Sequence, residues 1–184
     1  MRLFTGIDLP DEIRENLSRL LERLKPTARV KWSTARNLHV TTKFIGEWPQ
    51  ERLEELAAVL RGLPPAPPIR IAVQGLGWFP NPRSPRIFWA GLKADPALAE
   101  LARRTDQALA RIGVAGETRP YSPHLTLARI KEPVTLDRLR EATTALDSEA
   151  FGEFVAGQFH LYLSELARSG SVYTKLGSFP LGTS

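Results

Sequence analysis

The sequence predicts a fold of mixed helices and strands, arranged as two related lobes with a groove between them. The 184 residues suit a single domain, and 42% hydrophobic with 24% charged residues is ordinary for a globular protein. Strand-like and helix-like segments alternate along the chain. One four-residue pattern, His-x-Thr-x, occurs once in each half. We therefore expect residues 1–184 to form one two-lobed domain.

The first half of the chain opens on an apolar strand pattern, which ends where Pro10 and Asp11 begin a helix. Ile13 and several leucines recur at helical spacing until Pro26 ends this helix. A second helical pattern begins near Gln50, and the proline-rich segment 64–68 is a stiff connector. The elements predicted for this half are strands at about 2–9, 30–32 and 38–46, and helices at about 11–25 and 50–61.

The second half repeats the alternation of strands and helices. Turn-forming residues from Pro80 to Pro85 separate its first two strand patterns. The elements predicted for this half are strands at about 69–79, 86–92, 124–130, 154–165 and 171–179, and helices at about 95–112 and 135–146.

The repeated motif places two histidines in matching surroundings. It reads His39–Thr42 in the first half and His124–Leu127 in the second, each within a predicted strand. Side chains of a strand alternate between its faces, so a histidine and a threonine two positions apart point the same way. Because the ordinary pKa of histidine lies nearest neutrality, a facing pair suits combined acid and base catalysis. His160, the third histidine, lacks this context, and we interpret it as a structural or surface residue.

Composition excludes several other chemistries. The chain has no cysteine, so disulfides, thiolate metal sites and a cysteine nucleophile are ruled out. No cluster of histidines and carboxylates has the spacing of metal ligands, and we expect neither a metal nor a cofactor. No apolar run approaches the ~20 residues of a membrane span, and no signal-peptide layout precedes the first strand. We expect a cytoplasmic monomer that does not bind membranes. The net charge of +5 is compatible with RNA as a partner.

Several segments together resemble a known family, the 2H phosphoesterase superfamily, and within it the RNA 2′,3′-cyclic phosphodiesterases, also called 2′-5′ RNA ligase-like proteins. The segments that carry this resemblance are Arg2–Pro10, Asn37–Gly46, Arg86–Gly91, Pro123–Arg129, Leu161–Leu166 and Tyr173. The resemblance implies an α+β bilobal, pseudo-symmetric fold, with antiparallel sheets lining a central cleft and helices outside. It also implies hydrolysis of a terminal 2′,3′-cyclic phosphate on RNA to a 2′-phosphate, without a metal.

The resemblance also assigns roles to individual residues. These are His39 as proton donor, His124 as proton acceptor, Thr41 and Thr126 as phosphate ligands, Arg129 as a phosphate contact and Phe4 as a candidate for base stacking. Sequence reasoning alone does not decide which histidine is the acid.

Strand alternation raises a question about the residues that follow the motifs. Thr42 fills a position that is commonly apolar in the family, but it lies on the face opposite His39, so we expect an effect on packing alone. Lys43, four residues after His39, lies on the same face as the histidine in a regular strand, and we interpret it as a lysine at the edge of the groove. Arg129, five residues after His124, lies on the opposite face in a regular strand. It needs a twist, a bulge or a strand end to reach the cleft.

Other functions stay open beside this one. Run backward, the same acid–base machinery joins a 2′,3′-cyclic phosphate to a 5′-hydroxyl, which is 2′-5′ RNA ligation. A second enzyme reading is a phosphodiesterase for small cyclic nucleotides. A third reading is an RNA-binding module without turnover, which the intact histidines and threonines of both motifs argue against.

Overall fold

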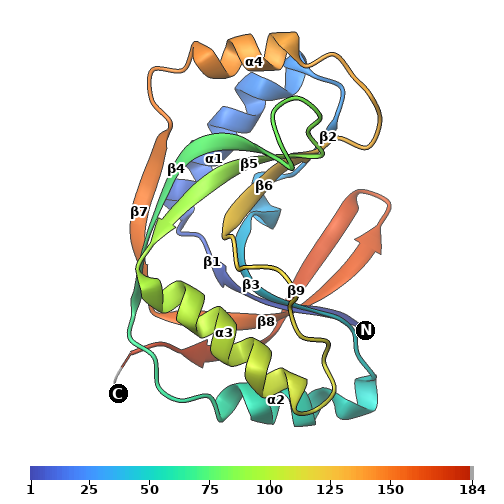
Figure 1. Cartoon of the computed structure of the whole chain (residues 1–184), viewed down its shortest axis with the longest axis vertical. Coiled ribbons are helices and arrows are strands. Elements are labelled where there is room, and N and C mark those ends of the chain that lie inside the picture. The colour runs from blue at the N-terminus through green and yellow to red at the C-terminus, as the bar shows by residue number, and fades with distance from the viewer. Residues whose placement is uncertain (183–184) are drawn as a thin grey trace.

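The computed structural model describes residues 1–182 as two lobes, each formed by an antiparallel sheet with two helices on its outer side (Figure 1). The sheet of the lower lobe has the strand order β3 (His39–Glu47), β1 (Arg2–Asp8), β8 (Gln158–Ala167), β9 (Gly170–Pro180). The sheet of the upper lobe has the order β2 (Lys31–Trp32), β6 (His124–Arg129), β5 (Ile87–Ala94), β4 (Ile69–Phe79), β7 (Ala150–Ala156). The predicted α+β bilobal architecture is confirmed.

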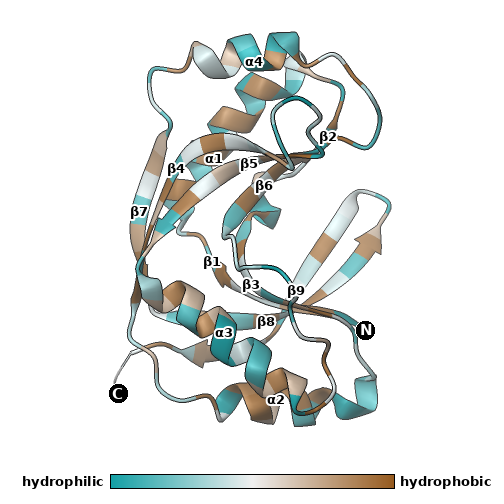
Figure 2. Cartoon of the chain, viewed as in Figure 1, coloured by the Kyte–Doolittle hydropathy of each residue, from teal (hydrophilic) through white to brown (hydrophobic). Residues whose placement is uncertain are grey.

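The helices are amphipathic, and Figure 2 shows hydrophobic and hydrophilic residues alternating along them. The upper lobe carries α1 (Asp11–Leu24) and α4 (Asp137–Thr144), and the lower lobe carries α2 (Leu53–Arg61) and α3 (Pro96–Ala110). Short 3₁₀ turns occupy Lys25–Thr27, Ala35–Asn37 and Gln50–Arg52. The apolar side of α1 meets β7, where Asn16 Nδ2 donates to Phe151 O at 2.8 Å. Buried side chains of both lobes join in one continuous core.

The lobes do not correspond to successive halves of the chain. Strand β1 belongs to the lower sheet, but the helix after it covers the upper sheet. Strand β5 belongs to the upper sheet, but α3, which follows it, packs on β3 of the lower sheet. The strand predicted over 154–165 is in fact two strands, because Gly157 separates β7 in the upper sheet from β8 in the lower one. The chain therefore crosses between lobes several times, which ties them together.

Strand β3 carries a β-bulge directly after its motif threonine. Gly6 of β1 pairs with Thr41, and Thr5 pairs with Lys43, so Thr42 is an extra residue in β3. Thr42 and Lys43 are both buried, with exposed fractions of 4% and 3%. Thr42 shares a 2.7 Å hydrogen bond with the hydroxyl of Thr5, so it lies on the core side of the strand, opposite His39, as expected.

Strand β6 carries the same irregularity at the same place. Trp89 of β5 pairs with Thr126, and Phe88 pairs with Ala128, so Leu127 is the extra residue. Leu127 and Ala128 are both fully buried. In each motif strand two consecutive residues thus point into the core. Beyond them the side chains alternate again, but each lies on the face opposite to the one it would have in a regular strand.

The two bulges change which residues of β3 and β6 reach the cleft. Phe44 and Arg129, each five residues after its histidine, return to the face that carries the histidines and are exposed. The question of how Arg129 could reach the cleft is therefore answered by the bulge.

The interpretation of Lys43 as a groove-edge lysine is wrong. Its ammonium group lies 2.8 Å from the Asp106 carboxylate and 3.2 Å from that of Glu117, and donates to Ala115 O at 2.7 Å. Asp106 belongs to α3, and the other two partners lie on the segment that leads to β6. Lys43 is thus a buried residue whose polar contacts join the first motif strand to the segment that leads into the second.

In the part of the chain that the structure describes, no helix is both long and apolar enough to cross a membrane.

We predict that replacing Lys43 by alanine destabilises the fold by roughly 2–4 kcal/mol, because Asp106 loses its buried partner. Urea denaturation measures this change, and Lys93→Ala on the exposed part of β5 is the matched control. Equal unfolding midpoints for the two variants would show that the buried ion pair contributes nothing.

Candidate active site

His39 stands at the beginning of β3, held by hydrogen bonds on both ring nitrogens. Its Nδ1 lies 2.8 Å from the carbonyl oxygen of Asn37, and its Nε2 lies 2.9 Å from Thr41 Oγ1. A carbonyl oxygen only accepts, so Nδ1 carries the hydrogen, and the neutral ring keeps its lone pair on Nε2. The Thr41 hydroxyl then donates to Nε2. The motif spacing of two residues places imidazole and hydroxyl together, as predicted.

His124, at the beginning of β6, repeats the hydrogen bond on Nδ1. Its Nδ1 donates to the carbonyl oxygen of Ser122 at 2.8 Å, again two residues before the histidine. Phe79 contacts the ring edge-on, with centroids 5.0 Å apart. Both histidines therefore hold the same tautomer, with Nε2 as the atom that can exchange a proton.

The two motifs come together because their strands meet across the cleft. β3 and β6 belong to different sheets, yet Cα atoms of the two strands approach within 8 Å. The hydroxyl of Tyr121, three residues before His124, donates to Thr41 O at 2.8 Å. Together with the contacts of Lys43, this contact fixes the segment that leads into the second motif against the first motif strand. Nothing local in the sequence around Tyr121 indicates this contact, because its partner lies in the other half of the chain.

Aromatic rings hold the His39 imidazole from the side of the sheet. Phe4 stacks on it with centroids 4.5 Å apart and the planes at 25°, and Tyr173 contacts its edge at 5.2 Å. Phe4 also stacks on Tyr162 at 4.9 Å and is only 3% exposed. No face of Phe4 is left for a nucleobase, so the prediction that Phe4 stacks on a base is wrong. Phe4 instead supports His39.

A glycine keeps space for this ring. A Cβ on Gly6 would lie 2.8 Å from Val40 O and 3.4 Å from Cδ2 of His39. Any larger residue would push β3 and the imidazole away from β1.

A charged network lies beside His39 on the same sheet. The Asp8 carboxylate accepts from the Tyr162 hydroxyl and pairs with Lys175, and His160 Nε2 lies 3.9 Å away. Burial disfavours the ionised carboxyl group, but hydrogen bonds from Lys175 and Tyr162 hold the pKa of Asp8 below its usual value. Sequence analysis missed Asp8 and Tyr162, although a polar residue at the end of an apolar strand is a usable signal.

His160 is a structural residue, as interpreted from the sequence. It is 2% exposed, and its Nδ1 lies 2.8 Å from the hydroxyl of Ser178. Burial, together with the charge of Lys175, lowers its pKa below 6.5.

The two candidate catalytic histidines are both neutral near pH 7. Burial lowers the pKa of His39 from 6.5 to about 4, and the hydrogen bond to Asn37 and the charge of Asp8 oppose this shift only in part. Burial also lowers the pKa of His124, with a contribution from the positive charge of Arg129. The low pKa values leave both rings uncharged, and the hydrogen bonds on Nδ1 make Nε2 of each ring the nitrogen that carries the lone pair.

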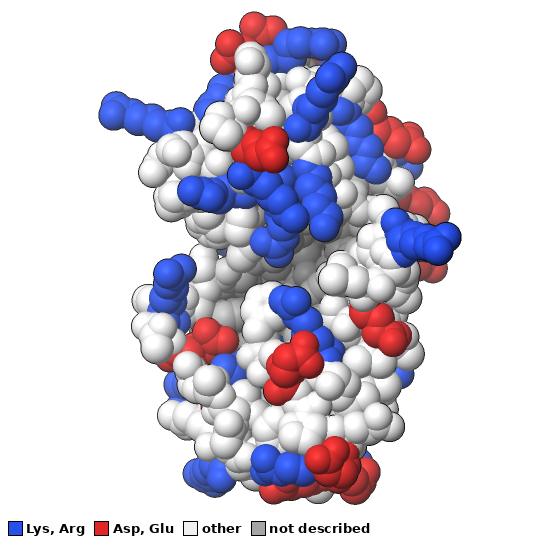
Figure 3. Space-filling view, turned by 90° about the vertical axis from the view of Figure 1, so that its right-hand side faces the viewer, with Lys and Arg blue, Asp and Glu red and all other residues white. Residues whose placement is uncertain are grey.

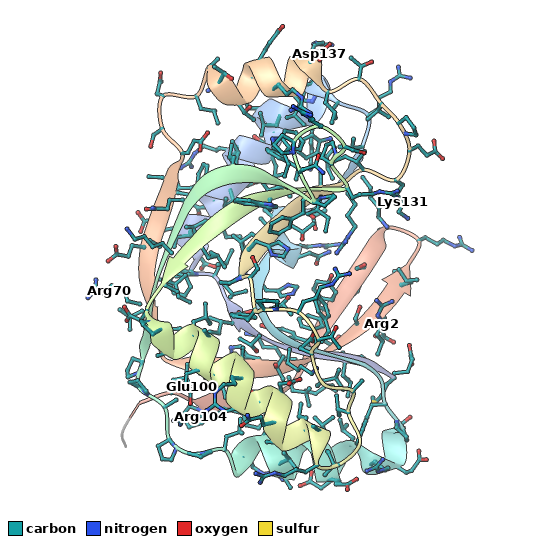
Figure 4. All side chains as sticks on the ribbon, in the orientation of Figure 1. Arg2, Arg70, Glu100, Arg104, Lys131 and Asp137 are labelled. Carbon is teal, nitrogen blue, oxygen red and sulfur yellow. The ribbon has the colours of Figure 1, made fainter. Side chains whose placement is uncertain are left out.

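A cluster of exposed basic residues borders the cleft on the upper lobe. Arg129 pairs in register with Lys31 on one side and Ile87 on the other, and Ile130 N donates to Arg86 O at 2.9 Å. We call Lys31, Arg129 and Lys131 the basic lip; all three are exposed. Figure 3 shows Lys and Arg gathered on the upper lobe above a hollow between the lobes. Figure 4 places Lys131 on the side where the β8–β9 hairpin projects.

Other cavities lie away from the histidines. One of about 430 Å³ lies between α2 and α3, and one of about 170 Å³ lies between α2 and β9. Neither is lined by a group with the acid–base properties of the His39 and His124 pair. Within residues 1–182, no three His, Asp or Glu side chains are grouped so that they could hold a metal ion.

Comparison with known proteins identifies the family. The model of the LigT-like phosphoesterases matches residues 7–89 and 92–173, so the chain belongs to this family. The RNA 2′,3′-cyclic phosphodiesterase of Methanothermobacter thermautotrophicus is 34% identical over 183 residues, which cover 98% of this chain and 99% of that protein. That of Archaeoglobus fulgidus is 35% identical over 181 residues, covering 97% and 99%.

Solved structures agree with this assignment. TT0787 of Thermus thermophilus superposes with a TM-score of 0.80 at 32% identity, covering 98% of both chains. Escherichia coli LigT in complex with 3′-AMP gives 0.78 at 29% identity, covering 99% of this chain and 98% of that one. The family assignment made from the sequence is confirmed.

We predict that NMR titration of the imidazole signals gives His39 a pKa of about 4 and His124 a pKa below 6.5. Because an unfolded chain takes up these protons near pH 6.5, the free energy of unfolding should fall as the pH drops from 6.5 toward 4. Inorganic phosphate in the cleft should raise both pKa values, because an anion favours the imidazolium form. A His39 pKa at or above 6.5 in the free protein would contradict the described site.

Proposed function

We propose that the protein hydrolyses the 2′,3′-cyclic phosphate at the end of an RNA to a 2′-phosphate. The observation that carries this proposal is the pair of imidazoles, each held in the same tautomer and each followed two residues later by a hydroxyl, on strands that meet at one cleft. The family and the full-length relatives support the same reaction.

Hydrolysis of the cyclic diester requires the attacking water to lose a proton and the departing 3′-oxygen to gain one. A neutral imidazole Nε2 takes a proton from water as its oxygen bonds to phosphorus, and an imidazolium Nε2 gives a proton to the departing 3′-oxygen. This assistance is typically worth ~10²–10⁴-fold. A protonated His39 no longer accepts from the Thr41 hydroxyl at Nε2, so the hydroxyls of Thr41 and Thr126 are both able to donate to the non-bridging phosphate oxygens, where negative charge grows. Arg129, aimed at the cleft by the bulge, adds positive charge.

Assigning the two roles depends on the bound phosphate. The resemblance makes His39 the donor and His124 the acceptor. With a pKa of about 4, His39 alone is almost entirely unprotonated at neutral pH. The phosphate anion, which lies against Nε2 in this proposal, raises the pKa of the ring that it contacts most closely, and so prepares the acid only when substrate is bound.

The site chemistry bears on the alternatives. A cyclic mononucleotide carries one phosphate and cannot contact all three exposed basic residues along the cleft, which favours RNA as the substrate. Reverse 2′-5′ ligation uses the same groups, but water at high concentration favours hydrolysis. A metal-free reaction, a monomeric state and a cytoplasmic location stay predictions.

We predict that a short RNA ending in 2′,3′-cyclic phosphate is converted to the 2′-phosphate with EDTA present. Chromatography against authentic 2′- and 3′-phosphate standards identifies the product. Formation of the 3′-phosphate alone, or loss of turnover on adding chelator, would refute the metal-free two-histidine reaction.

We predict that His39→Ala and His124→Ala each lower kcat by roughly 10²–10⁴-fold while the protein stays folded. Thr41→Val and Thr126→Val should each lower kcat/KM by roughly 10²-fold. Thr174→Val, at an exposed position of β9, is the matched control and should leave activity unchanged. Circular dichroism checks the fold of every variant. A histidine variant with near-native turnover would exclude that residue from catalysis.

A further inference from the structure

Phe44 is the counterpart, in the first motif strand, of Arg129 in the second. Each follows its histidine by five residues, and each is turned to the cleft face by the bulge before it. Phe44 is 60% exposed. Among the described residues every other Phe, Tyr and Trp is buried or half-buried. The fold thus puts a charged side chain on one wall of the cleft and a bare aromatic ring at the equivalent place on the other.

The ring of Phe44 is held in place relative to the histidine. Its centroid lies 6.3 Å from that of Phe4, with the planes at 50°, and Phe4 stacks on His39. Phe44 follows Thr41 by three residues, but because of the bulge their partners on β1, Phe4 and Gly6, are only two residues apart, which is roughly 7 Å at the usual rise per residue. Phe44 therefore lies about one nucleotide's reach from the hydroxyl that would hold the phosphate.

The two walls match the two parts of a nucleotide. The basic lip suits phosphates, and an exposed aromatic face suits a base, because bases stack on aromatic side chains. We infer that Phe44 stacks on the base of the nucleotide that carries the cyclic phosphate. This inference rests on the proposed function. It assigns base stacking to Phe44 because Phe4 is buried. Because every base has a stacking face, the contact tolerates all four bases and favours the larger purines.

The test compares two substrates with four proteins. One RNA ends in adenosine 2′,3′-cyclic phosphate, and the other ends in the same cyclic phosphate on a ribose without a base. The proteins are wild type, Phe44→Ala, Phe44→Trp and the control Val155→Ala, which removes an exposed apolar side chain from β7 at the edge of the upper sheet. Steady-state kcat and KM are measured for each pair, and urea denaturation checks stability.

For the adenosine substrate, Phe44→Ala should raise KM by roughly 5- to 150-fold with kcat nearly unchanged, the range that base–aromatic stacking covers. Phe44→Trp should keep a KM near that of wild type, and Val155→Ala should change neither constant. For the substrate without a base, wild type should lose the same factor, and Phe44→Ala should cost nothing more.

Two results would overturn the inference. If Phe44→Ala costs as much on the substrate without a base, the ring acts through Phe4 and His39 rather than on a nucleobase. If Phe44→Ala lowers kcat and leaves KM unchanged, Phe44 supports the reaction geometry and does not bind the base. Wild type that hydrolyses neither substrate would instead refute the proposed function, and this inference with it.

Discussion

A β-bulge after each motif threonine decides which side chains of β3 and β6 reach the cleft. Because of one extra residue, Thr42 in β3 and Leu127 in β6, this residue and the one after it both point into the core. The next residue then returns to the side of the histidines. The bulges therefore produce the two different walls of the cleft, with Phe44 on one and Arg129 on the other. They also send Lys43 to the helix side, where it can form a buried ion pair.

The site depends on rigid supports that lie far apart in the chain. Backbone carbonyls two residues before each histidine set both tautomers, so the strands themselves orient the proton-carrying atoms. Tyr121 and Lys43 join the approach to the second motif to the first motif strand, although β3 and β6 belong to different sheets. Since the chain crosses between lobes several times, the cleft is bounded by two sheets that share one core. Such preorganisation keeps donors and acceptors aligned without reorganisation during the reaction.

Strand and helix periodicity predict the elements and the pairing of each histidine with its threonine, the motif repeated in each half predicts two lobes, and the family resemblance implies the antiparallel sheets that line the cleft. Periodicity failed at Lys43, because alternation holds only within a regular strand and the bulge depends on the partner strand. It could not find Tyr121, Asp8 or Tyr162, whose partners are distant in sequence. The base-stacking role expected for Phe4 failed because burial beneath His39 is a tertiary property. The strand predicted over 154–165 failed because an apolar run does not show where the chain changes sheets.

The central claim is that His39 and His124 flank one phosphate held by both motif threonines. A crystal structure with a bound nucleoside 2′-phosphate, the expected product, tests it most directly. The account predicts phosphate oxygens within hydrogen-bond distance of Nε2 of both histidines and of the hydroxyls of Thr41 and Thr126. A phosphate that contacts one histidine alone, or that binds outside the cleft between β3 and β6, would contradict it.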